Sequence, residues 1–436
     1  MKVTDILNTS NKAFPSLEIV PPLRGLTKTE LLESIAPFME FSPKYINVTS
    51  HRDEFEFREE ADGTFSRHLL RNRISETTVC AAIMSKYDVE TVPHIICAGT
   101  TAEEIESKLD NLEFLGINNI VALRGDSMTG EKRFSPTPGG YRYASELVEG
   151  IRKYQGSAGY QRKRALEMTD SDRYFCIGVG GYPEKHFEAA NIETDIANLK
   201  KKIDAGADYV ITQMFFDNQV YYDFVRRCRE AGITVPIIPG LKPLSTARQV
   251  NMLPESFSLD IPVELTSEIA KAGDDKDAIY QIGTEWCIAQ CKDLIAHGVP
   301  AVHFYTMGKS KNIINILFFQ ICLLNCQFHI FLHKFTFGQF PAFFTKKRIF
   351  DFLVKVFPKR TFRFFRSYSR CRRKDGDASG KPYCLFTNSF THLTNTSILQ
   401  NNIQVQPAWM SASRKRSQDQ PQQTFLLPFQ IPFLLF

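Results

Sequence analysis

Residues 121–126 read VALRGD, an apolar, β-rich run that passes through a glycine turn and ends on a carboxylate. The same order, a short apolar run followed within a residue or two by a reactive side chain, recurs along the first 312 residues. The side chains in these positions are Glu18, Thr49, His94, Asp126, Tyr182 and Gln213. Reactive residues at strand ends are the layout of a (β/α)8 barrel, whose carboxyl-end loops carry the chemistry. The sequence therefore predicts an α/β fold of the TIM-barrel class.

Eight runs rich in Val and Ile are the expected strands of this barrel. Most of them are continuous in apolarity rather than alternating, which suits strands covered on both faces. The runs are residues 17–20, 45–48, 91–97, 119–123, 175–179, 209–212, 235–238 and 301–305. Segments of helical period lie between them, and three of these, residues 101–115, 191–205 and 218–231, are each followed by a glycine suited to a helix C-cap.

Three connections are longer than a barrel needs: residues 50–72, 127–140 and 156–172. Loops of this length without internal structure are usually binding loops, lids or insertions. The first two flank the proposed site, and the third is expected to be a solvated insertion.

The charge balance divides the chain near Asn312. Residues 1–312 carry a net charge of −8, whereas residues 313–436 carry +13, hold 21 of the 36 Phe and contain no Glu. Soluble domains normally carry charges of both signs. We therefore expect a folded barrel over residues 1–312 and a basic, Phe-rich tail over 313–436 that is not a folded domain.

Two interpretations of the tail stay open. Its basic-aromatic stretches, such as residues 359–366, have the composition that binds phosphate backbones or membranes. The tail equally fits translation of a shifted reading frame, because it lacks the local consistency of a folding chain. Residues 313–332 carry no charge but include Asn, Gln and His, which disfavours insertion into a bilayer. We expect neither nucleic-acid binding nor membrane contact.

The N-terminus and the cysteines indicate the compartment. Residues 1–14 lack the apolar core of a secretory signal, which predicts a cytoplasmic protein. The ten cysteines are dispersed through apolar segments without the paired spacing of a zinc site, so we expect buried thiols and no metal.

Glu18 stands inside an apolar run that Pro21 and Pro22 end, so its carboxyl is expected near the barrel mouth in a weakly hydrated place. Desolvation raises the pKa of a carboxyl, which suits a proton donor near neutrality. Its position fits a structural carboxylate paired with an arginine equally well. Asp126 likewise fits either a group that stabilises a developing cation or an ordinary turn residue.

The chain has neither the Gly-x-Gly-x-x-Gly pattern nor a complete Gly-x-x-x-x-Gly-Lys-Ser/Thr phosphate loop. A phosphate-bearing cofactor would therefore have to use helix N-termini and basic side chains, for which Arg124, Lys201 and Lys202 are available.

Taken together, eight motifs resemble the methylenetetrahydrofolate reductase family, in order through nearly all of residues 10–312. The motifs are EIVPP (18–22), NVT (47–49), PH (93–94), ALRGD (122–126), GYPEKH (181–186), DAGAD (204–208), ITQMFFD (211–217) and HFYT (303–306). The resemblance implies an FAD-containing barrel that passes a hydride from NADH or NADPH to 5,10-methylenetetrahydrofolate. The product, 5-methyltetrahydrofolate, serves methionine synthesis.

The resemblance also implies roles for individual residues. Glu18 matches the general acid that helps open the folate imidazolidine ring, and Asp126 matches the aspartate beside flavin and pterin that favours the resulting cation. Gln213 matches a glutamine shared by folate and nicotinamide, and Gln249 a further folate contact. The family pattern places FAD against Thr49, His94, Arg124, Gly125, Asp126, Ala144, Tyr182, His186, Asp195, Asn198, Lys201 and Lys202.

Two departures from the family pattern concern ligand contacts. Ser50 stands where the family commonly has Tyr, and Gly308-Lys309 stands where it commonly has Asn-Arg. Lys309 is the corresponding candidate for substrate binding, although lysine does not reproduce the fork-shaped contacts of arginine.

The interpretation we favour is thus a folate reductase that acts on folate and nicotinamide as a homo-oligomer. Two alternatives stay open at this point. One is another FAD barrel oxidoreductase resembling proline dehydrogenase, and the other is an inactive barrel whose tail binds nucleic acid or a membrane.

Overall fold

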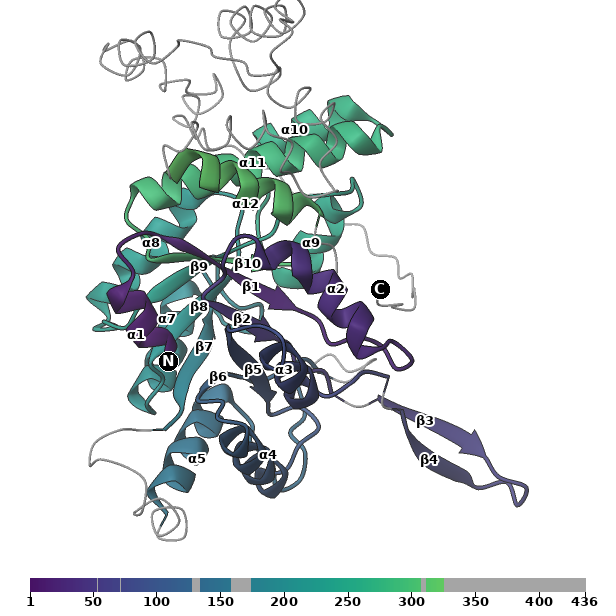
Figure 1. Cartoon of the computed structure of the whole chain (residues 1–436). Helices are drawn as coiled ribbons and strands as arrows, with labels where there is room; N and C mark the ends of the chain where they lie inside the picture. The colour runs from purple at the N-terminus through teal and green to yellow at the C-terminus, as the bar shows by residue number, and fades with distance from the viewer. Residues whose placement is uncertain (53, 71, 128–133, 158–173, 307–310, 325–436) are drawn as a thin grey trace, which may run out of the picture. The chain divides into compact units, whose positions relative to one another are not determined.

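The computed structural model describes residues 1–52, 54–70, 72–127, 134–157, 174–306 and 311–324. Eight parallel strands close into a barrel in the order β1-β10-β9-β8-β7-β6-β5-β2 (Figure 1), which confirms the predicted TIM-barrel class. The barrel strands are β1 (Phe14–Ile19), β2 (Tyr45–Val48), β5 (Glu90–Ile96), β6 (Asn119–Leu123), β7 (Cys176–Gly181), β8 (Tyr209–Met214), β9 (Ile237–Leu241) and β10 (Ala301–Tyr305). Each of the eight predicted strands overlaps one of these.

Helices alternate with the strands and cover the outside of the barrel (Figure 1). They are α1 (Val3–Thr9), α2 (Lys28–Met39), α3 (Glu76–Met84), α4 (Ala102–Phe114), α5 (Ala144–Gly156), α7 (Ile192–Asp204), α8 (Asn218–Glu230), α9 (Gln249–Phe257), α10 (Val263–Ala272), α11 (Lys276–Ala296) and α12 (Lys311–Leu324).

Helix α4 shows how local sequence sets the helix ends. At its start Thr101 accepts a hydrogen bond from the Glu104 N–H at 3.2 Å, and the Glu104 carboxylate accepts from the Thr101 N–H at 2.8 Å. This capping box satisfies two N–H groups that would otherwise lack partners. After its end, Gly116 adopts a φ of 75°, which only glycine adopts without strain.

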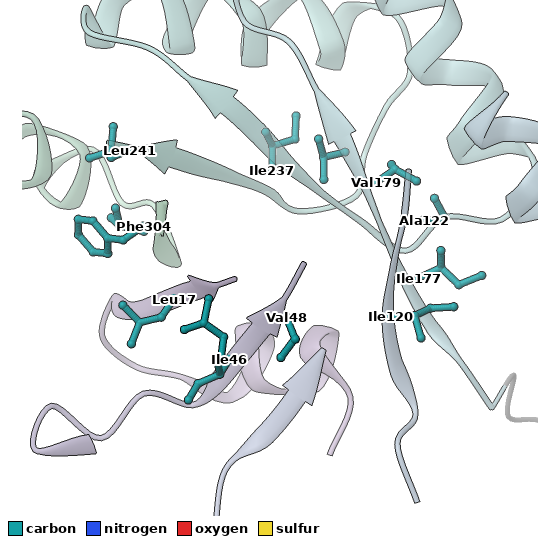
Figure 2. Close-up of a cluster of buried hydrophobic side chains, with 14 of the residues drawn as sticks. Leu17, Ile46, Val48, Ile120, Ala122, Ile177, Val179, Ile237, Leu241 and Phe304 are labelled. Carbon is teal, nitrogen blue, oxygen red and sulfur yellow. The ribbon is translucent and has the colours of Figure 1, made fainter. Parts of the chain in front are cut away.

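Alternate residues of each barrel strand face the helices. Figure 2 shows ten of these outward-facing side chains: Leu17, Ile46, Val48, Ile120, Ala122, Ile177, Val179, Ile237, Leu241 and Phe304. They form the main core together with buried helix residues such as Ile35, Leu109 and Leu199. Their apolarity explains why the strands are readable from sequence.

The inward-facing residues form two layers of different character. The layer near the amino ends of the strands is apolar, with Phe14, Tyr45, Val121 and Tyr209 packed together, and α1 covers this end of the barrel. The layer nearer the carboxyl ends is polar. The barrel is therefore closed by apolar packing at one end and carries its ionisable groups at the other.

The expectation of a loop over residues 50–72 is wrong, because this connection contains an antiparallel hairpin of β3 (Glu54–Glu59) and β4 (Phe65–Leu70). Figure 1 shows the hairpin extending away from the barrel. Its turn has Asp62 followed by Gly63, whose φ is 79°. Asp-Gly between alternating polar and apolar residues is a strong hairpin signal that the sequence interpretation missed.

Helix α12 extends the packed core beyond Asn312, since Ile313, Ile316 and Leu317 are buried in the main core. Residues 325–436 and residues 158–173, which hold most of the expected tail and insertion, lie outside the described residues. Among the helices that the structure describes, none is long and apolar enough to cross a membrane. Six cysteines, Cys80, Cys97, Cys176, Cys228, Cys287 and Cys291, are buried free thiols, as expected.

Candidate active site

Glu18 is a largely enclosed carboxylate at the mouth of the barrel. It faces inward from the end of β1, and its side chain is 13% exposed. Its Oε2 lies 3.9 Å from His94 Nε2 on β5 and 3.8 Å from His303 Nε2 on β10. Three strands therefore bring one carboxylate and two imidazoles together. Among the residues that the structure describes, the ion-pair partners of Glu18 are these histidines and not an arginine.

A fully buried polar group supports His303 from beneath. Ser16, Asn47 and His303 have no exposed surface. The Oγ of Ser16 lies 2.9 Å from His303 Nδ1 and accepts a hydrogen bond from Asn47 Nδ2 at 3.3 Å. The parallel register of β1 and β10 places Ser16 opposite His303 and Glu18 opposite Tyr305, which explains how the group is aligned.

The amide nitrogen of Asn47 can only donate, so it occupies one lone pair of the Ser16 hydroxyl. The hydroxyl can then donate its hydrogen to His303 Nδ1 or use its second lone pair to accept from an Nδ1–H, according to the tautomer of the ring. In the first arrangement the ring hydrogen lies on Nε2, the nitrogen nearest the carboxylate of Glu18.

The expected rise in the pKa of Glu18 is not observed. Burial does raise it, and burial is the largest single influence. The neighbouring imidazoles of His303, His94 and His51 together lower it by more, so the pKa lies below its usual value. The sequence interpretation was wrong here because it could not place these histidines beside Glu18.

The pKa of His94 is also lowered, but here burial is the cause. It is 5% exposed, and burial lowers its pKa to about 4, although the negative charge of Glu18 acts to raise it. Near neutral pH the imidazole is therefore uncharged. Its Nε2 is buried and has no hydrogen-bond partner among the described residues.

Tyr305 and Thr306 hold the end of β10 in place. The Tyr305 hydroxyl donates to the Thr212 carbonyl at 2.6 Å, and its ring meets His303 edge-on at 4.9 Å. The Thr306 hydroxyl donates to the Glu18 backbone carbonyl at 2.6 Å. A side chain at Gly240 would come within 2.7 Å of the Tyr305 ring, so the glycine makes room for it.

The β6 end carries the second predicted carboxylate. Gly125 has a φ of 83°, and a Cβ there would approach the Ala98 Cβ to 2.8 Å, so only glycine allows this turn. The following Asp126 is exposed. Its negative charge acts to raise the pKa values of both His51 and Tyr182, although burial is the larger influence on each and lowers the pKa of His51 overall. The charge of Glu18 also acts to raise the pKa of His51, so this histidine interacts electrostatically with both predicted catalytic carboxylates.

The loop after β7 holds Tyr182 and His186, whose rings meet edge-on at 4.8 Å. Lys202 donates to the Gly180 carbonyl at 2.6 Å and lies 5.8 Å from the Tyr182 ring. Burial lowers the pKa of Lys202 to about 8. Asp195, which is buried on α7, accepts from the His186 N–H at 2.9 Å. Four predicted cofactor residues are thus in one contiguous group.

Arg124 belongs to the same side of the mouth. Its guanidinium forms a bidentate ion pair with Glu188 of the β7–α7 loop, with Nη1 bonded to Oε2 and Nη2 at 3.2 Å from Oε1. The guanidinium also lies 5.0 Å from the Phe134 ring. This pair links the ends of β6 and β7.

The remaining predicted site residues are less closely grouped. Thr49 follows β2 and its hydroxyl lies 3.0 Å from His51 Nε2. Ala144 begins α5, and the exposed Asn198 and Lys201 contact each other on α7 at 3.1 Å. Lys309 lies outside the described residues.

The two predicted substrate glutamines use their carbonyl oxygens within the protein. Gln213 Oε1 accepts from the Met214 N–H at 2.9 Å. Gln249 Oε1 accepts from the Ser245 and Thr246 N–H groups at 2.8 and 3.2 Å. The NH2 group of each amide is the part available as a donor to a ligand.

Sequence reasoning assigned no role to Ser16, Asn47, His51 or Tyr305. A signal for them exists, because Ser16 and Glu18, like His303 and Tyr305, are two residues apart on one strand and so face the same side. No group of three or more His, Cys, Asp or Glu suited to a metal ion occurs within the described part of the chain.

The fold and the site define a (β/α)8-barrel protein with a buried carboxylate–histidine group at the carboxyl ends of its strands. The family model for methylenetetrahydrofolate reductase matches residues 2–319, and the chain belongs to that family.

Three relatives illustrate the similarity. The chain is 31% identical over 325 residues to methylenetetrahydrofolate reductase (NADH) 1 of Arabidopsis thaliana, covering 72% of this chain and 49% of that protein. It is 31% identical over 306 residues to a probable methylenetetrahydrofolate reductase (NADPH) of Caenorhabditis elegans, covering 70% and 42%. It is 31% identical over 296 residues to 5,10-methylenetetrahydrofolate reductase of Escherichia coli, covering 68% and 86%. The chain thus spans about half the length of the plant relative and most of the bacterial one.

Proposed function

We propose that this chain reduces 5,10-methylenetetrahydrofolate to 5-methyltetrahydrofolate, with NADH or NADPH as reductant and FAD as cofactor. Membership of the family supports the reaction, and relatives named for each nicotinamide support either reductant. The observation that carries the proposal is the buried Glu18 carboxylate between His94 and His303 at the mouth. We further propose that the protein is a cytoplasmic homo-oligomer whose product serves methionine synthesis.

The residues at the mouth fit FAD. Its diphosphate needs positive charge, which Arg124, Lys201 and Lys202 provide. The buried Lys202 has a lowered pKa, and a bound anion would favour its charged form. Tyr182 and His186 offer aromatic surface, and the side-chain-free turn at Gly125 permits close approach. When bound, FAD supplies a carrier for the hydride between nicotinamide and folate.

The chain's own residues divide into two groups in this proposal. The cofactor would be held by Thr49, His94, Arg124, Gly125, Asp126, Ala144, Tyr182, His186, Asp195, Asn198, Lys201 and Lys202. The substrate would be contacted by Asp126, Gln213, Gln249 and Lys309. Thr49, Arg124, Gly125, Asp126 and Tyr182 share a placement just after strand ends, which supports this division, whereas Asp195, Asn198, Lys201 and Lys202 lie on α7.

Glu18 acts as the proton donor in this proposal, which requires its carboxyl to be protonated. In the ligand-free protein its pKa lies below the usual value, so the carboxyl is ionised near pH 7. Burial is already the largest influence on it, and a substrate that displaces water would increase that influence and raise the pKa. His94 stays neutral meanwhile, so it does not stabilise the anion by its charge.

Asp126 acts through its charge. A cation that develops on the folate during ring opening is stabilised by a nearby carboxylate, and more strongly once the substrate excludes water from the mouth. The field of Asp126 already reaches His51 and Tyr182, on the loops that follow β2 and β7. Its exposed position leaves it accessible to a ligand.

The family match supports the folate reductase over both alternatives raised by the sequence. A relative of proline dehydrogenase would not match the reductase family model over residues 2–319. An inactive barrel would not need the ionisable group that Glu18, His94 and His303 form.

The deciding experiment follows the flavin absorbance of the purified full chain. We expect a yellow protein whose absorbance is bleached anaerobically by NADH or NADPH and restored by methylenetetrahydrofolate. Proline in place of the nicotinamide should not bleach it. A protein that takes up no FAD, or that is bleached by proline and not restored by methylenetetrahydrofolate, would rule the proposal out.

A further inference from the structure

The loop that joins β7 to α7, residues 182–191, contains a strained residue. Lys185 has a φ of 107°, a conformation that a residue with a side chain rarely adopts. Such strain persists only where the surrounding contacts impose it. A carboxylate contact fixes each neighbour of Lys185: the Glu184 side chain binds the backbone of Asp260, and Asp195 binds the backbone of His186. Glu184 Oε2 accepts from the Asp260 N–H, and Asp195 Oδ2 accepts from the His186 N–H at 2.9 Å.

The Glu184 contact joins two distant segments. Asp260 lies between α9 and α10, 76 residues along the chain from Glu184. In the proposed function, the β7–α7 loop carries the flavin contacts Tyr182 and His186, whereas α9 begins with the folate contact Gln249. The hydrogen bond between Glu184 and Asp260 therefore connects the flavin side of the mouth with the folate side.

The other carboxyl oxygen of Glu184 lies in an unfavourable environment for a negative charge. Its Oε1 is buried and has no hydrogen-bond partner among the described residues. The charged groups that face the carboxyl are Asp260 and Asp217, the N-cap of α8, and both are negative. The adjacent Lys185 ammonium donates to the Ala189 carbonyl at 3.1 Å. An ionised Glu184 would thus be a buried anion close to two others.

The balance of these influences favours the protonated carboxyl. The Asp260 N–H acts to lower the pKa of Glu184, because an N–H bonds more strongly to a carboxylate than to a neutral acid. Burial and the charges of Asp260 and Asp217 act to raise it by more, to about 7. The carboxyl of Glu184 therefore keeps its proton until the pH approaches about 7.

We propose that Glu184 is a positioning residue whose buried carboxyl fastens the β7–α7 loop to Asp260 and holds Lys185 in its strained conformation, and that the fastening opens when the carboxyl ionises. The fastened state binds the proton more tightly than an open state in which Glu184 reaches water. Raising the pH through about 7 therefore shifts the equilibrium toward the open state.

Hydrogen–deuterium exchange of the Asp260 amide tests the fastening directly. The full chain is labelled at pH 6 and pH 8, with labelling times scaled to the intrinsic exchange rates. With a pKa of about 7 when fastened and about 4.5 when open, linkage predicts that protection falls about tenfold between the two pH values. Protection of the barrel strand β6 should not change.

Three variants separate the carboxyl from other effects. Glu184→Gln keeps a carbonyl acceptor without a titrating proton, so protection should be retained and independent of pH. Glu184→Ala should lose protection at both pH values. Glu255→Gln makes the same change at an exposed position of α9 and should still show the tenfold fall. The proposal is overturned if Glu184→Gln keeps the pH dependence of the unchanged chain, or if β6 loses protection to the same extent.

A second measurement concerns the ligand and rests on the proposed function. FAD affinity should fall on raising the pH from 6 to 8 in the unchanged chain but not in Glu184→Gln. Absence of any FAD binding would contradict the proposed function while leaving the exchange result intact. Absence of pH-dependent exchange would contradict the fastening, whatever the flavin does.

Discussion

The Nε2 of His303 lies 3.8 Å from Glu18 Oε2, although the two residues stand at opposite ends of the barrel sequence. The closure of β1 against β10 brings them together, and Ser16, held in the same register, fixes the orientation of the imidazole. Glu18 is therefore not an isolated carboxylate in an apolar place. Its charge state depends on two strands that lie elsewhere in the sequence, and the predictions below depend on this arrangement.

Glu18→Gln should separate the two halves of the proposed reaction. Transfer from nicotinamide to flavin needs no ring opening, so flavin reduction should stay nearly unchanged. Reoxidation by methylenetetrahydrofolate should slow by about 10²-fold or more, the usual scale for a lost general acid. Rapid mixing measures each half separately, with Glu33→Gln, an exposed position of α2, as the control. Equal slowing of both halves would mean that Glu18 is structural.

Ser16→Ala should destabilise the protein and weaken the folate half of the reaction. The change leaves the buried Asn47 amide and His303 Nδ1 without their shared partner. An unsatisfied buried polar group costs about 1–3 kcal/mol of the free energy of unfolding. Denaturant titration measures this loss, and Ser267→Ala, at an exposed position of α10, should change little. A neutral effect of Ser16→Ala would show that the hydroxyl does not orient His303.

The strands were predictable because the outward-facing residues are apolar. Residues 45–48, 119–123 and 301–305 match their strands at both ends, since these runs are bounded by polar residues or turns. The prediction for β1 began three residues late, at Leu17 instead of Phe14. Pro15 and Ser16 interrupt the apolar run, and Ser16 faces the polar inward layer, where it contacts His303.

The candidate site was predictable in outline and not in its electrostatics. Glu18 and His94 were identified from their places at strand ends, which is a local feature of sequence. The direction of the pKa shift of Glu18 depends on His94 and His303 in three dimensions, and strand closure decides it. The hairpin of β3 and β4 was missed for another reason, because a long connection was taken as a loop without weighing its Asp62-Gly63 turn.

His94 should make stability depend on acid pH. Its pKa is about 4 in the folded protein, below the value of about 6.5 expected when unfolded. The unfolded chain therefore binds the extra proton first, so this contribution is complete above pH 6.5 and is lost as the pH falls toward 4. The loss is on the order of 3 kcal/mol. Denaturant titrations at pH 7 and pH 4.5 should show a smaller fall in His94→Gln than in the unchanged chain. The same fall in both proteins would contradict this.

Gly125→Ala should be more damaging than Gly116→Ala. Both glycines have a positive φ, 83° and 75°, so both substitutions carry a backbone cost of about 1–2 kcal/mol. Only at Gly125 does the new Cβ meet another atom, the Ala98 Cβ at 2.8 Å, whereas the space at Gly116 is open. We expect about 1–3 kcal/mol more destabilisation at Gly125 together with weaker FAD binding. Comparable losses of stability and of FAD affinity in the two variants would show that the turn before Asp126 tolerates a side chain.

Two truncations should locate the end of the catalytic unit. A chain ending at Asn312 removes Ile313, Ile316 and Leu317, each buried in the main core and each stabilising it by about 1.5–3 kcal/mol. We expect this chain to be insoluble or to bind no FAD. A chain ending at Leu324 keeps α12 and should match the full chain in FAD content and turnover. Its soluble yield should be higher, because it lacks apolar segments such as residues 425–429. Loss of FAD binding in the chain that ends at Leu324 would show that residues beyond 324 belong to the fold.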